Sequence, residues 1–145
     1  MSAAHIVCPA CRAVNRIAAG RVAAEAKCGA CGVAIFSGQP VAVDEAALAR
    51  HVARDDIAVL VDVWAEWCAP CRAMAPDFAR AAALLEPDMR LLKLDADAAP
   101  AFCARHGVSS IPTLLLFRDG EVVARVSGAM SASRIAHWAR SSLPG

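Results

Sequence analysis

The sequence predicts an α/β protein in which helices cover a central β-sheet, with a small cysteine-rich unit ahead of it. From residue 40 onward, apolar β-branched runs alternate with helical patterns. The residues before that are short segments interrupted by glycines and by two Cys-x-x-Cys pairs. The 145 residues suffice for one ordinary domain plus an appendage, and Ser37-Gly38-Gln39-Pro40 has the composition of a linker. We therefore expect one unit over residues 1–38 and a second over residues 39–145.

Nine elements are expected after residue 40, in the order β-α-β-α-β-α-β-β-α. They are a strand at 40–43, a helix at 44–54, a strand at 57–64, a helix at 70–85, a strand at 89–94, a helix at 98–106, strands at 113–117 and 121–126, and a helix from about residue 131. Asp44 is a good helix N-cap, and Gly107 is a good residue to end the third helix. Asp119-Gly120 between two apolar runs indicates a hairpin. This order is typical of a layered α/β fold.

The composition excludes several classes of partner. The chain is 58% hydrophobic and 20% charged, which is enough apolar material for a packed core. Its net charge of +1 gives no electrostatic reason to bind nucleic acid or a membrane surface. The longest apolar runs are far shorter than the roughly 18 residues that a membrane span requires, and we expect no export signal. We therefore expect a cytoplasmic monomer. In that reducing compartment, cysteine pairs bind metal or carry out redox chemistry more often than they form structural disulfides.

The first two cysteine pairs have the spacing of a four-thiolate metal site. Cys8 and Cys11 form one pair, Cys28 and Cys31 form the other, and sixteen residues separate the pairs. Two residues between cysteines allow one tight turn to direct both sulfurs at a tetrahedral Zn²⁺. Four protein ligands leave no position for a substrate, so we predict one structural zinc that stabilises this core-poor segment. The alternatives are two disulfides, reduced surface thiols, or iron in place of zinc.

The third pair has a different setting. Cys68-Ala69-Pro70-Cys71 follows a buried strand and begins a helix, whose free N–H groups and dipole stabilise a thiolate at Cys68. Cys71 lies one turn into the helix and is expected to be more shielded. A Cys-x-x-Cys pair alone would fit metal binding or chance, but this strand-to-helix setting favours reversible disulfide chemistry.

Four segments together resemble the thioredoxin family in order and spacing. They are Val61-Asp-Val-Trp-Ala-Glu-Trp-Cys-Ala-Pro-Cys71, Pro76, Ile111-Pro-Thr113 and Gly128-Ala129. The resemblance covers roughly residues 40–145. It implies the thioredoxin fold, a central mixed sheet flanked by helices, here with a zinc-ribbon-like unit in front. It also implies a protein-disulfide reductase that a flavin- and NADPH-dependent thioredoxin reductase recharges.

The resemblance implies roles for the cysteines and for the residues around them. Cys68 would attack the target disulfide, and Cys71 would resolve the mixed disulfide. Asp62 matches the family's buried carboxylate, and Lys93 matches the lysine beside it. A desolvated aspartate has a raised pKa and can accept the Cys71 proton, whereas an acid on a partly exposed strand face would be the alternative reading of Asp62.

The resemblance also predicts a surface that receives the substrate. Pro112 matches the family's cis-proline, which faces the disulfide. Trp67, Ile111, Gly128 and Ala129 would form a flat apolar patch for an extended segment of a substrate protein.

One position departs from the family pattern. Ala69 stands where the family usually has glycine, and the dipeptide between the cysteines tunes the redox potential. A disulfide oxidase or isomerase is therefore an alternative to a reductase. A redox-sensing zinc module that regulates partner binding is the alternative from another class. The seventh cysteine, Cys103, is interpreted as a buried small hydrophobic residue rather than as a regulatory thiol.

Overall fold

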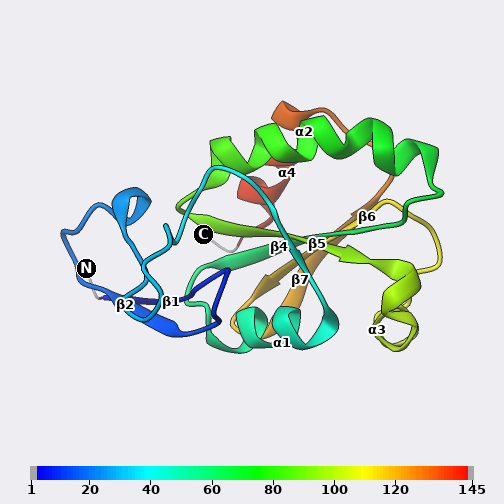
Figure 1. Cartoon of the computed structure of the whole chain (residues 1–145). Helices are drawn as coiled ribbons and strands as arrows, with labels where there is room; N and C mark the ends of the chain where they lie inside the picture. Colours follow the sequence, from blue (N-terminus) through cyan, green and yellow to red (C-terminus); the bar gives the residue numbers. More distant parts are fainter. Residues whose placement is uncertain (1–2, 144–145) are drawn as a thin grey trace.

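The computed structural model describes residues 3–143 and has the α/β architecture that the sequence predicts (Figure 1). The two ends of the expected units, residues 1–2 and 144–145, lie outside the described residues. In chain order the elements are β1 (Ala4–Val7), β2 (Val14–Ile17), the 3-10 helix η1 (Ala23–Glu25), β3 (Val41–Val43), α1 (Glu45–Arg54), β4 (Ala58–Trp64), α2 (Ala69–Leu85), β5 (Met89–Asp95), the 3-10 helix η2 (Ala96–Ala98), α3 (Pro100–Arg105), β6 (Thr113–Arg118), β7 (Glu121–Ser127) and α4 (Ala132–Ser142).

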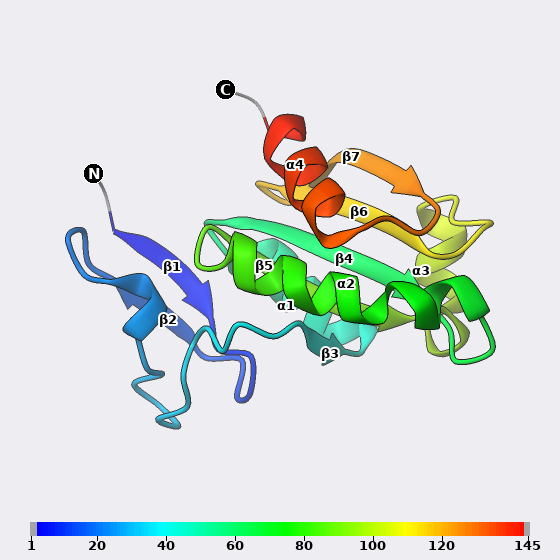
Figure 2. The ribbon, with the colours of Figure 1, turned by 90° about the horizontal axis from the view of Figure 1, so that it is seen from above.

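The larger sheet has five strands in the order β3-β5-β4-β6-β7. Strands β3, β5 and β4 are parallel to one another, whereas β6 is antiparallel to β4 and β7 is antiparallel to β6. The sheet is therefore mixed. Helices α2 and α4 cover one face, and α1 and α3 cover the other (Figures 1 and 2). The central strand β4 is buried on both faces, as its β-branched sequence predicts.

Local signals place the ends of these elements. The Asp44 carboxylate accepts a hydrogen bond from the Ala47 N–H at 2.7 Å and caps α1. Asp119 and Gly120 have φ values of 52° and 85°, the left-handed pair that a tight hairpin between β6 and β7 requires. Helix α3 begins two residues later than expected because the 3-10 helix η2 occupies residues 96–98.

We call the described segment before β3, residues 3–38, the ribbon, and it contains a separate two-stranded sheet. Strands β1 and β2 pair in an antiparallel hairpin, which the sequence analysis did not predict. The core of the ribbon is a small apolar cluster, formed by Ile6, Cys8, Cys28, Ile35 and Phe36. Ile57, just before β4, packs against this cluster rather than extending the strand. The ribbon therefore lies beside the start of β4, whereas α2 begins beyond the far end of that strand (Figure 2).

None of the helices in the described part of the chain has the length and apolar character needed to cross a bilayer.

Candidate functional site

Cys68 and Cys71 lie at the point where β4 leads into α2. Cys68 is the N-cap of α2, Cys71 lies in its first turn, and the two form a disulfide whose Cα atoms are 5.2 Å apart. The Cys71 backbone N–H donates a hydrogen bond to the Cys68 Sγ at 3.2 Å. A sulfur at this position accepts a free N–H of the helix N-terminus, which favours the thiolate when the disulfide is open.

Both cysteines are buried in a small apolar cluster. Cys68 is 4% exposed and Cys71 is 1% exposed, and they pack with Ala65, Trp64 and Ile111. Cys71 is the more shielded of the two, as expected, but the difference is small. The Cys68 Sγ lies 3.8 Å from the carbonyl oxygen of Ile111.

Asp62 is a buried carboxylate on β4. It is 1% exposed, and neither carboxylate oxygen has a hydrogen-bond partner among residues 3–143. Desolvation raises its pKa from 3.8 to about 7, and the positive charge of Lys93 opposes that rise in part. The structure therefore excludes the alternative of an acid on a partly exposed face.

Lys93 stands directly opposite Asp62 in the β4–β5 register. Its ammonium lies 4.5 Å from the centre of the Trp64 ring, in a cation–π contact. In the described residues no ion pair within 4.0 Å joins Lys93 to Asp62, so Lys93 acts on the carboxylate only as a nearby charge.

The expected substrate surface is assembled from two loops. The Ile111–Pro112 peptide bond is cis, as the resemblance predicts. The Gly128 N–H donates to the Pro112 carbonyl at 2.9 Å, so the segment after β7 lies against the proline loop. Ala129, next to Gly128, is exposed, and within residues 3–143 no hydrogen bond joins it to the other site residues.

Trp67 is 68% exposed beside the disulfide, and its indole N–H donates to the Asp97 carboxylate at 2.8 Å. Sequence reasoning missed Asp97, because its partner lies 30 residues away and no local motif marks it. Trp67 and Ile111 are among the residues that line a shallow groove of about 400 Å³. Cys103 lines the same groove and is half-buried, which corrects the expectation of a fully buried residue. Burial raises the pKa of its thiol.

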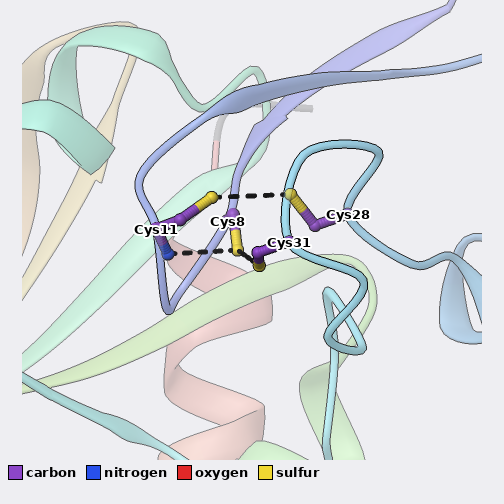
Figure 3. Close-up of side chains that lie close together, drawn as sticks. All are labelled: Cys8, Cys11, Cys28 and Cys31. Carbon is purple, nitrogen blue, oxygen red and sulfur yellow. Dashed lines mark hydrogen bonds between the residues drawn. The ribbon is translucent and has the colours of Figure 1, made fainter.

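The four ribbon cysteines converge on one point (Figure 3). Their Sγ atoms all lie within 4.8 Å of one another, and the Cys8–Cys31 and Cys11–Cys28 pairs are each 3.6 Å apart. A tetrahedral Zn²⁺ with Zn–S bonds of about 2.3 Å needs sulfurs about 3.8 Å apart. The donor set and its dimensions therefore fit a four-thiolate metal centre.

The two cysteine turns are built alike. The Arg12 N–H donates to the Cys8 carbonyl at 3.1 Å, and the Gly32 N–H donates to the Cys28 carbonyl at 2.8 Å. Both donors have positive φ, 67° at Arg12 and 83° at Gly32. The first cysteine of each turn is buried and the second is exposed.

Asn15 is a residue of this centre that the sequence analysis missed. Its side-chain amide donates to the Cys28 Sγ at 3.4 Å, and its Oδ1 accepts from the Gly29 N–H at 2.9 Å. The hydrogen bond from Asn15 is the largest influence that lowers the pKa of Cys28, to about 6. Asn15 thus ties β2 to the second cysteine turn.

A helix-capping Cys-x-x-Cys disulfide beside a cis-proline, on a mixed sheet with two helices on each face, defines a thiol–disulfide oxidoreductase. Comparison with known proteins agrees: the profile of the family described as Thioredoxin matches residues 39–141. A second profile, described as "Thioredoxin 2, N-terminal", matches residues 7–33. The chain belongs to the thioredoxin family, and its ribbon resembles the zinc ribbon of thioredoxin 2.

Relatives cover most of the chain. It is 38% identical over 133 residues to thioredoxin C-3 of Corynebacterium nephridii, in a match that spans 92% of this chain and 91% of that protein. It is 41% identical over 96 residues to the thioredoxin of Pseudomonas aeruginosa, in a match that spans 66% of this chain and 89% of that protein. Among solved structures, a point mutant of the thioredoxin from Halobacterium salinarum NRC-1 is similar, with a TM-score of 0.66 and 31% identity over 73% of this chain and 92% of that one.

Proposed function

We propose that this thiol–disulfide oxidoreductase reduces disulfide bonds in cytoplasmic proteins and that Cys68 is its nucleophile. The observation that carries the assignment is the Cys71 N–H that donates to the Cys68 Sγ at the start of α2. This contact stabilises a thiolate at Cys68, while Cys71 is held inside the first helical turn.

The reaction then has two exchange steps. The Cys68 thiolate attacks one sulfur of the target disulfide, forms a mixed disulfide and expels the other target sulfur as a thiolate. The Cys71 thiol loses its proton and attacks the Cys68 sulfur, which closes the Cys68–Cys71 disulfide and expels the second target sulfur. The target gains two electrons, and this protein loses two.

We assign the proton transfer in the second step to Asp62. A buried carboxylate with a pKa near 7 and no fixed partner can accept a proton at neutral pH. Lys93 opposes the rise in that pKa, and so keeps part of the Asp62 population ionised. Pro112, Trp67, Ile111, Gly128 and Ala129 are proposed to receive the target segment. A flavin- and NADPH-dependent thioredoxin reductase is the proposed source of electrons.

Serine variants of the two cysteines test the assignment. Cys71→Ser should accumulate mixed disulfides with target proteins, because attack survives and resolution is lost. Cys68→Ser should neither reduce nor trap targets. Cys103→Ser is the control for the loss of a thiol outside the Cys-x-x-Cys pair and should not accumulate mixed disulfides. If Cys68→Ser trapped targets and Cys71→Ser did not, the two roles would be reversed.

We propose further that Cys8, Cys11, Cys28 and Cys31 hold one structural zinc. The converging sulfurs and the match to the thioredoxin 2 N-terminal profile support it. When bound, the metal supplies folding free energy to the ribbon and offers no open coordination position. Elemental analysis of the purified protein should give about one zinc per chain, and Cys8→Ser should lower that content. Iron, or no metal, in the purified protein would contradict the proposal.

A further inference from the structure

The two halves of the proposed substrate surface are held together at the end of one strand pair. Pro112 precedes β6 and Gly128 follows β7, and the last paired residues of those strands are Thr113 and Ser127. Any change in the spacing of this pair is therefore transmitted to both loops.

A chain of hydrogen bonds fixes that spacing. The Thr113 hydroxyl donates to the Ser110 carbonyl at 2.6 Å, and its oxygen lies 2.9 Å from the Ser127 hydroxyl oxygen. A threonine hydroxyl has one proton, so Ser127 must donate in the second bond. The chain runs from Ser127 through Thr113 to the backbone of the proline loop.

The environment of the two hydroxyls differs. Thr113 is 1% exposed, so its hydroxyl depends on these partners, whereas Ser127 is exposed at the end of β7 next to Gly128. The Ser110 carbonyl that receives the bond lies one residue before Ile111, whose own carbonyl faces the Cys68 Sγ at 3.8 Å. This series of hydrogen bonds thus links the exposed Ser127 to the backbone next to the Cys68 sulfur.

We infer that Thr113 and Ser127 are positioning residues that set the distance between the proline loop and the Gly128 loop for the binding of disulfide-bonded proteins. Neither touches the reacting sulfurs; both act through the backbone that contacts the target. This inference rests on the proposed function, because it concerns how a protein target is held. It predicts that loss of either hydroxyl weakens the binding of an extended target and leaves sulfur exchange itself intact.

Thr113→Val and Ser127→Ala test the inference by comparing two substrates. With insulin, which presents disulfides in a folded protein, kcat/KM should fall about three- to tenfold through a rise in KM, the range expected for one lost hydrogen bond. With 5,5′-dithiobis(2-nitrobenzoic acid), a small disulfide that needs no extended surface, the rate should change by less than about twofold.

Three controls separate positioning from stability. Thr113→Ser keeps the hydroxyl and should restore most of the activity with insulin. Ser141→Ala removes a hydroxyl that also donates to a backbone carbonyl, but in α4, and should leave both rates unchanged. The double variant should lose no more activity with insulin than Thr113→Val does, because the two hydroxyls belong to the same series of hydrogen bonds.

The outcomes of the inference and of the proposed function can be told apart. Equal losses with both substrates, or no loss with insulin, would overturn the positioning role. If the unmodified protein failed to reduce insulin at all, the proposed function would fail instead.

Discussion

Arg90 at the start of β5 donates a hydrogen bond from its Nη2 to the Val7 carbonyl in β1 at 3.1 Å, although 83 residues separate them. The guanidinium also lies 4.7 Å from the centre of the Phe36 ring and is 1% exposed. The Val7 N–H donates to the Asp55 carboxylate at 2.7 Å, and His51 holds the other oxygen of that carboxylate at 2.7 Å. We call the described residues after the ribbon, 39–143, the sheet domain, and its side chains therefore satisfy both polar groups of Val7. This anchors the ribbon at the end of the sheet away from the Cys68–Cys71 disulfide.

Replacement of Arg90 should loosen this anchor. Arg90→Met keeps the length of the side chain but leaves the buried Val7 carbonyl without its donor, so the free energy of unfolding should fall by about 1–3 kcal/mol. Arg50→Met is the matched control, because Arg50 also donates to a ribbon carbonyl, that of Arg12, from an exposed position. That change should cost less than about 0.5 kcal/mol. Urea unfolding measures the free energy of unfolding of both variants. Equal losses in the two variants would contradict the assignment of Arg90 as the anchor of the ribbon.

The raised pKa of Asp62 makes stability depend on pH. The folded protein holds the Asp62 proton up to about pH 7, whereas the unfolded chain releases it near pH 3.8. The folded state thus binds more protons between these values, and the Asp62 contribution to stability declines as pH rises from about 4 to 7. Asp62→Asn removes this penalty. The oxidised variant should be more stable than the unmodified protein at about pH 8, by at most about 4 kcal/mol, and equal to it near pH 3. If the difference in the free energy of unfolding between the two proteins were the same at every pH in this range, the assigned pKa would be refuted.

If the ribbon holds zinc as proposed, Asn15 should slow the loss of that metal. Asn15→Ala removes the donor to the Cys28 Sγ and the acceptor of the Gly29 N–H, and groups of this kind typically change metal affinity by about tenfold or more. Transfer of zinc to a coloured chelator should therefore speed up about tenfold. Arg16→Ala, at the exposed neighbouring position of β2, should leave the rate unchanged. Identical rates for both variants would show that the backbone alone holds the site.

A truncated chain that begins at Val41 tests the expected boundary between the two units. The sheet domain keeps both of its apolar clusters, so it should fold and still reduce a small disulfide. It should be less stable than the full chain, because Arg90 and Asp55 lose their ribbon partners. A folded truncated chain without any reductase activity would show that the ribbon belongs to the catalytic apparatus.

The order of strands and α-helices after residue 40 and both cysteine systems could be predicted from the sequence, because each depends on local signals, whereas the β1–β2 hairpin could not. Period, capping and turn residues mark the strands and helices, and the Cys-x-x-Cys spacing marks the turns that converge on one point. The cis-proline at Pro112 followed only from family resemblance, since most X-Pro bonds are trans. Asn15, Asp97 and Arg90 could not be predicted. Each acquires its partner through the approach of distant segments, and none stands in a recognisable motif.

The reduction potential of the Cys68/Cys71 couple tests the central claim most directly. It can be measured by equilibration of the 145-residue chain with glutathione or dithiothreitol buffers, followed by quantification of the two redox forms. A reductase should have a potential near the value of about −270 mV typical of thioredoxins, despite Ala69 between the cysteines. A potential near about −120 mV, that of a strong disulfide oxidant, would contradict the account and favour oxidation as the direction of catalysis.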